Sequence, residues 1–151
     1  MKKFLFVMFT ILIGLIQSYA EVSKDQLVEI KILRKLAKDI TGKTFPNVSI
    51  YSSKNYFEIF KKYSNLNIVK NFNKADIIIV LNIPKKLPNN KPIFAVGYLT
   101  FKNCKPCIGG LYWKKGRPQL ILIKERLQYF KINIPKEYRF YIISINELER
   151  W

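Results

Sequence analysis

The stretch ADIIIVLN, residues 75–82, places the strongest constraint on the fold. It holds four consecutive β-branched residues, Ile77 to Val80, and such side chains favour extended backbone. A strand with one face in water alternates apolar and polar residues, whereas this run is apolar on both faces. We therefore expect a strand that is covered on both sides, and KPIFAVGY, residues 91–98, predicts a second one. Two such strands are typical of a layered α/β domain.

An amphipathic helix is predicted ahead of these strands, between Ser23 and Gly42. Ser23 and Gln26 have the spacing of a capping box, in which the hydroxyl accepts a backbone N–H and the amide reaches back to the cap. Gly42 can end the helix in a left-handed conformation, and Pro46 prevents its continuation. One apolar stripe at three- and four-residue spacing must face a core: Leu27, Ile30, Leu33, Leu36, Ala37 and Ile40.

The segment between this helix and the apolar strands predicts a strand, a helix and a weaker strand. NVSIYSS, residues 47–53, has the composition of a short strand that ends in a turn. KNYFEIFKKY, residues 54–63, predicts a helix with Phe57 and Phe60 on its inner side. LNIVKNF, residues 66–72, predicts the weaker strand.

An antiparallel hairpin is predicted by IGGLYWKKGRPQLILI, residues 108–123, in which Lys-Lys-Gly-Arg joins two extended runs. Gly116 can supply the positive φ that such a turn requires. Pro118 has no backbone N–H, which limits the second run to a sheet edge or to its own first position. Alternation along the first run places either Tyr112 or Trp113 in the core and leaves the other for a partner contact.

Two terminal helices are predicted after the hairpin. KERLQYF, residues 124–130, predicts a short helix, and Pro135 suits the first turn of a final helix that carries Tyr138, Tyr141 and Ile142. The predicted fold class of residues 21–151 is therefore α/β, a single-domain layered sandwich. Its sheet is expected to be mixed and mostly parallel, with a C-terminal antiparallel hairpin and two terminal helices.

Residues 1–20 predict a secretory signal peptide. Lys2 and Lys3 precede a 13-residue run, Phe4 to Ile16, that is apolar apart from Thr10 and Gly14, and Ser18 and Ala20 stand at the −3 and −1 positions of a small-residue cleavage site. The run is short for a membrane span, which needs about 20 apolar residues, so an uncleaved anchor is the less favoured alternative. We expect a periplasmic location for the mature domain.

Export changes the meaning of the strong positive charge. The net charge of +17 falls to +15 when Lys2 and Lys3 leave with the predicted leader. Outside the cytoplasm we expect no nucleic acid partner, but anionic lipid head groups, cell-wall polymers or acidic protein surfaces. The lysines are dispersed along the chain rather than stacked on one helix face, which favours a solvated surface as the simpler interpretation.

Cys104 and Cys107 have the spacing of thiol oxidoreductases. A helix N-terminus lowers the thiol pKa in those enzymes, whereas Ile-Gly-Gly-Leu-Tyr-Trp after Cys107 predicts extended backbone. A c-type haem requires His after the second Cys, and a closed zinc site requires four ligands, but the chain has two Cys and no His. We expect a local disulfide and neither metal nor cofactor; reduced, inert cysteines and a catalytic redox pair stay open as alternatives.

No catalytic set of residues is evident, and we predict a protein that is not an enzyme. The absence of His removes Ser-His and Cys-His nucleophiles, the ten acids are dispersed, and the glycines form no phosphate-binding motif. Cations in the hairpin turn can hold an anion, although a solvated turn is the simpler interpretation. The candidate partner-binding residues are Tyr112, Trp113, Lys114, Lys115 and Arg117.

The order of these elements resembles that of the YfiR-like periplasmic proteins. The opening helix through FPNVSIYS resembles the first helix and strand of that family, and ADIIIVLN and KPIFAVGY resemble its two buried strands. IGGLYWKKGRPQLILIKERLQYFKINIPKEY resembles its C-terminal hairpin and helices, with Gly116 and Arg117 at a Gly-Arg turn. The chain departs from the family at Lys124, where Asn is frequent, and Cys104 and Cys107 match no cysteines of the family.

The resemblance implies a non-enzymatic regulator that binds the periplasmic part of an inner-membrane signalling protein, such as a diguanylate cyclase or a sensor kinase, and holds it inactive. It implies no catalytic residue. Two alternatives stay open: a thiol–disulfide protein that uses Cys104 and Cys107, and a small-ligand receptor with a pocket at the strand ends. A homodimer and contact with an anionic membrane surface are also open.

Overall fold

The computed structural model describes residues 22–150 of the chain. The predicted leader and its cleavage site lie outside the described residues. Within 22–150, no helix combines the length and the apolar content that crossing a membrane requires.

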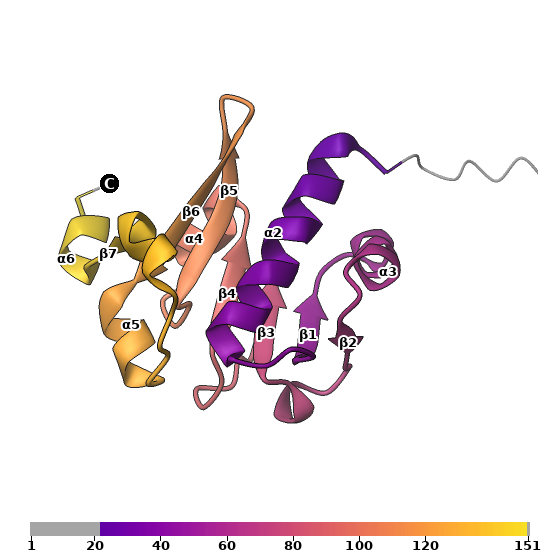
Figure 1. Cartoon of the computed structure of the whole chain (residues 1–151), viewed down its shortest axis with the longest axis horizontal. Helices are drawn as coiled ribbons and strands as arrows, with labels where there is room; N and C mark the ends of the chain where they lie inside the picture. The colour runs from indigo at the N-terminus through magenta and orange to yellow at the C-terminus, as the bar shows by residue number, and fades with distance from the viewer. Residues whose placement is uncertain (1–21, 151) are drawn as a thin grey trace, which may run out of the picture.

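A mixed sheet runs through the middle of the described part, with strand order β2-β1-β3-β4-β5-β6-β7 (Figure 1). All neighbouring strands are parallel except β5 and β6, which form the antiparallel hairpin. The predicted mostly parallel sheet with a C-terminal hairpin is therefore confirmed. The strands are β1 (Asn47–Tyr51), β2 (Asn67–Ile68), β3 (Ile77–Val80), β4 (Ile93–Val96), β5 (Gly109–Lys114), β6 (Arg117–Ile123) and β7 (Ile142–Ile143).

Helices cover both faces of this sheet and produce two hydrophobic cores. In Figure 1, α2 crosses the near face and α4 lies behind the sheet. Strand β3 is buried along its whole length: Ile77 and Ile79 belong to the core under α2, whereas Ile78 and Val80 belong to the core under α4. The helical elements are α2 (Lys24–Thr41), α3 (Lys54–Tyr63), η1 (Phe72–Lys74), α4 (Tyr98–Asn103), α5 (Lys124–Tyr129), η2 (Lys136–Tyr141) and α6 (Ile145–Leu148).

Helix α2 begins and ends as its sequence predicts. Ser23 and Gln26 form the capping box, and Gly42 is left-handed with φ 64°. The predicted stripe is buried from Ile30 to Ile40, but Leu27, in the first turn of the helix, is 41% exposed. Glu29 is buried instead, which the apolar stripe did not predict.

Two elements in the first half differ from the prediction. On α3, Phe60 is fully buried as expected, but Phe57 is only half-buried, and Tyr56 and Ile59 complete the inner face. The strand expected over residues 91–98 ends at Val96, because Gly97 has φ 96° and turns the chain into α4. Helix α4 was not predicted.

The C-terminal segment also differs from the prediction. The helix expected after the hairpin is confirmed as α5, and Pro135 precedes a helical segment as expected. That segment is the 3₁₀ helix η2, which ends at Tyr141. Ile142, expected on the final helix, belongs to β7, and α6 follows it.

The hairpin is formed by a two-residue turn. Lys115 and Gly116 have φ values of 51° and 72°, and Lys114 pairs directly with Arg117. Positive φ at both central positions suits the right-handed twist of the two strands. Pro118 lies at a free edge of β6, as predicted, since β7 pairs only with residues 122 and 123.

Strand β5 begins with two adjacent glycines, Gly109 and Gly110. A methyl group on Gly109 would collide with the carbonyl oxygen of Ile121, and one on Gly110 would lie 2.5 Å from the ring of Phe101. The first glycine lets β6 approach, and the second lets α4 approach.

Candidate functional site

A groove of about 650 Å³ runs between α2, η2 and the β5–β6 hairpin. It is larger than two other hollows of the described part, of about 200 and 220 Å³. It lies along the C-terminal half of the sheet rather than at the ends of the parallel strands. Its lining residues are Lys31, Ile32, Arg34, Lys35, Lys38, Leu111, Pro118, Leu120, Glu137, Tyr138 and Tyr141.

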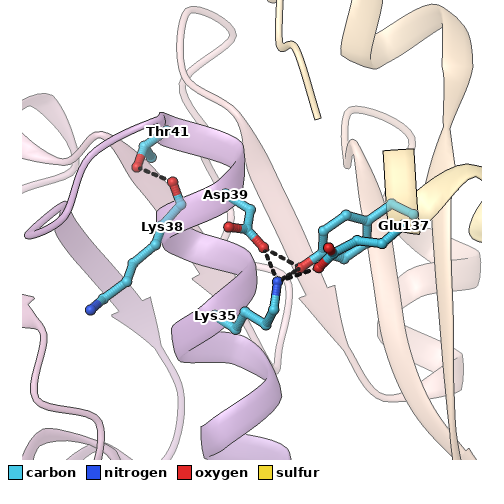
Figure 2. Close-up of polar contacts among 6 residues, drawn as sticks. Lys35, Lys38, Asp39, Thr41 and Glu137 are labelled. Carbon is cyan, nitrogen blue, oxygen red and sulfur yellow. Dashed lines mark hydrogen bonds and ion pairs between the residues drawn. The ribbon is translucent and has the colours of Figure 1, made fainter. Parts of the chain in front are cut away.

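A cluster of polar side chains near the C-terminus of α2 joins the α2 and η2 walls of the groove. Lys35 Nζ lies 2.7 Å from Asp39 Oδ2 and 2.5 Å from Glu137 Oε1, so this lysine joins α2 to η2 (Figure 2). The Tyr138 hydroxyl donates to the same Asp39 oxygen at 2.5 Å. Lys38 points away from this cluster, and its Nζ lies 5.6 Å from the centre of the Phe45 ring.

These contacts shift the pKa values of both donors upward. The hydrogen bonds from Lys35 to Asp39 and Glu137 stabilise the ammonium form and raise the pKa of Lys35. Burial, together with the hydrogen bond to Asp39, raises the pKa of Tyr138 to about 12. Both groups therefore keep their protons across the physiological range.

A second polar cluster fixes the other end of α2 to the hairpin. Glu29 is 8% exposed and accepts two hydrogen bonds, from the Tyr56 hydroxyl at 2.6 Å and from Trp113 Nε1 at 2.9 Å. Tyr56 belongs to α3 and Trp113 to β5, so one carboxylate of α2 joins three elements. Burial, and then the nearby Glu29 charge, raise the pKa of Tyr56.

The two clusters lie at different points along α2, and only the Lys35 cluster contributes residues that line the groove. Glu29 and Asp39 are ten residues apart, which corresponds to about 15 Å along a helix axis. Among residues 22–150, the side-chain hydrogen bonds that link the α2 and η2 walls of the groove run from Lys35 to Glu137 and Tyr138 and from Tyr138 to Asp39. These contacts hold the two walls at a fixed separation.

The structure separates the five predicted partner-binding residues into two groups. Lys114, Lys115 and Arg117 are exposed at the hairpin tip, and none forms an ion pair with an acid of the described part. Tyr112 is 7% exposed and packs against Tyr98 on the α4 side, so it is the core residue of its pair. Trp113 is the half-buried one, and its indole N–H is occupied by Glu29.

Cys104 and Cys107 are joined by a disulfide, with their Cα atoms 5.4 Å apart. Both are buried, at 2% and 0% exposure, and the bridge follows α4 and leads directly into β5. Arg126 of α5 donates to the Cys107 carbonyl, and burial lowers the pKa of Arg126. An activated thiol requires exposure and a positive environment such as a helix N-terminus, and this pair has neither an exposed sulfur-bearing residue nor that position in a helix.

The gathering of cations on one face of α2 was not predicted from the sequence. Lys31, Arg34, Lys35 and Lys38 follow a three- and four-residue spacing, and all four line the groove. This contradicts the expectation that lysines are not stacked on a helix face. Their periodicity could have been found, but the groove wall opposite, η2, lies about 100 residues further along the chain.

No protein-family model matches the chain, and no curated protein matches its sequence. The YfiR-like resemblance therefore stays a prediction.

Proposed function

We propose that the chain is an exported, non-enzymatic binding protein that regulates an inner-membrane signalling protein, of the diguanylate cyclase or sensor kinase kind, by contacting its periplasmic part. The observation that carries the proposal is the hairpin tip. It projects beyond the neighbouring strands and presents Lys114, Lys115 and Arg117 to solvent (Figure 1).

Rigid presentation supports a role in recognition. The tip is fixed by its two-residue turn, and its base is fixed by the Trp113–Glu29 hydrogen bond. A surface that is already ordered loses little conformational entropy when it binds, so more of its contact energy appears as affinity. Exposed cations that pair with no acid of residues 22–150 suit an acidic partner surface, which they can also steer into contact.

The proposal is tested by crosslinking and then by measured affinity. A photoreactive amino acid at position 115 should crosslink an inner-membrane sensor in the native cells, whereas one at position 61 on α3 should not. Binding of the purified periplasmic part of that sensor is then measured with wild-type protein and with the Lys114→Gln/Lys115→Gln/Arg117→Gln variant. We expect an affinity loss of about tenfold or more, because charged contacts at an interface are lost.

The matched control removes three exposed cations from other parts of the surface, as Lys61→Gln/Lys62→Gln/Lys74→Gln. It has the same net charge as the tip variant and should bind nearly as well as wild type. An equal loss of affinity in both variants would mean that the tip acts only through the total charge of the protein. Unchanged binding in the tip variant would show that the tip is not the contact site.

A further inference from the structure

The groove has the dimensions and composition of a small-molecule site. Its volume of about 650 Å³ lies within the range of about 300–1,000 Å³ that ligand pockets occupy. Its apolar lining comes from both walls, with Ile32 on α2, Leu111 on β5 and Leu120 on β6. Apolar walls with few polar groups are typical of sites that bind the hydrocarbon part of a ligand.

The groove is formed before any ligand arrives. Its α2 and η2 walls are joined by the Lys35 contacts to Glu137 and Tyr138 and by the hydrogen bond from Tyr138 to Asp39. Lys35, Glu137 and Tyr138 line the groove and are not free to collapse into it, because each is engaged in a hydrogen bond. A preformed site avoids the entropic cost of ordering its walls on binding.

The charges around the groove favour an anion. Among residues 22–150, the only acid that lines it is Glu137, and this carboxylate is engaged by Lys35. Lys31, Arg34 and Lys38 line the groove and form no ion pair in that part of the chain, but the ammonium of Lys38 lies over the Phe45 ring, which leaves Lys31 and Arg34. Two uncompensated cations beside an apolar floor match one carboxylate, whose two oxygens a guanidinium and an ammonium can bind together.

We infer that the groove between α2, η2 and the hairpin binds a single-chain carboxylate amphiphile, such as a medium-chain fatty acid. The carboxylate lies at Lys31 and Arg34, and the hydrocarbon chain lies over Ile32, Leu111 and Leu120. The inference uses none of the hairpin-tip cations and does not depend on the proposed regulatory partner.

Ligand chemistry is tested with four probes on the mature chain, residues 21–151, by isothermal titration calorimetry below the micelle concentration. Dodecanoate should bind, while acetate, which lacks the chain, and dodecyltrimethylammonium, which reverses the charge, should bind at least about tenfold more weakly. Dodecyl phosphate should bind no more tightly than dodecanoate. Equal binding of the cationic probe, tighter binding of the phosphate, or no binding of dodecanoate would overturn the inference.

The position of the ligand is tested by substitution and by methyl chemical shifts. Lys31→Gln/Arg34→Gln should weaken dodecanoate binding by about tenfold or more, because hydrogen bonds between charged groups are lost. Lys61→Gln/Lys62→Gln, which removes the same charge from exposed positions on α3, should change it by less than about twofold. Dodecanoate should also shift the methyl signals of Ile32, Leu111 and Leu120.

Two outcomes of this second test contradict the proposed site. Equal weakening in both variants would mean that the protein attracts the anion only through its total charge. Methyl shifts confined to the Tyr98 and Leu148 hollow on the opposite face would place the ligand elsewhere. Circular dichroism of both variants shows whether α2 and α3 stay folded.

Discussion

Two polar clusters fasten α2 to the rest of the molecule, and they differ chiefly in burial. Glu29 is 8% exposed and accepts from two neighbouring elements, whereas the Lys35 and Glu137 side chains of the other cluster are 58% and 60% exposed. Water can replace a lost partner at Lys35 but cannot easily reach Glu29. Hydrogen bonds of similar length should therefore differ several-fold in their contribution to stability.

The largest effect is expected from Glu29→Ala. The substitution leaves the Tyr56 hydroxyl and the Trp113 indole N–H without an acceptor, and each unsatisfied buried donor costs about 1–3 kcal/mol. We expect the free energy of unfolding to fall by about 3 kcal/mol, measured by urea denaturation. Glu58→Ala, at an exposed position on α3, is the control and should change it by less than about 0.5 kcal/mol. A loss of unfolding free energy in Glu29→Ala no larger than that in Glu58→Ala would contradict the expectation that the buried cluster contributes more to stability.

The next effect is a loss of stability at alkaline pH. The pKa of Tyr56 is raised in the folded protein, so its stabilising contribution is complete below the ordinary tyrosine value of 10 and is lost as the pH rises toward the folded value. Between about pH 9 and about pH 11 this one tyrosine should remove about 1.4 kcal/mol from the free energy of unfolding.

Urea denaturation of Tyr56→Phe at these two pH values tests this expectation. The variant should be less stable at pH 9 but should lose less stability on the way to pH 11 than wild type does. Tyr129 is 73% exposed, so Tyr129→Phe is the control and should follow the wild-type profile. Parallel profiles for wild type and Tyr56→Phe would show that Tyr56 ionises equally well in both states.

The smallest effect is expected at the exposed cluster. Lys35→Met removes the contacts to Asp39 and Glu137, but Tyr138 still donates to Asp39 and water can solvate both carboxylates. The free energy of unfolding should fall by less than about 1 kcal/mol, and by less at high salt than at low salt. Lys31→Met, which removes a cation that forms no ion pair within residues 22–150, should have no comparable salt dependence. A loss as large as that of Glu29→Ala would remove the distinction between the two clusters.

The parts of the fold that depend on local pattern were predictable. The apolar run in β3, the capping box of α2 and the turn at Gly116 each specify their own conformation through neighbouring residues. Helix α4 was not predictable in this way, because Tyr98-Leu99-Thr100-Phe101 has strand-like composition and becomes helical only after the turn at Gly97. Strand β7 has two residues and exists through its pairing with β6.

The candidate site was less predictable than the fold, because distant segments form it. The disulfide was expected from the predicted export together with the short separation of Cys104 and Cys107, and it is present. Glutamate is usually exposed, and the burial of Glu29 is explained only by Tyr56 and Trp113, which come from two other elements and both donate to its carboxylate. The groove likewise requires α2 and η2 to meet, and no local pattern in either segment indicates the other.

The glycine pair at the start of β5 has a consequence for the ancestry of this protein. Because strand β6 occupies the space beside Gly109 and helix α4 occupies the space beside Gly110, neither position can acquire a side chain while this architecture persists. Exposed lysines can drift freely over generations, but this doublet cannot. The Gly-Gly doublet at the start of the hairpin should therefore persist in related chains after much of their surface sequence has changed.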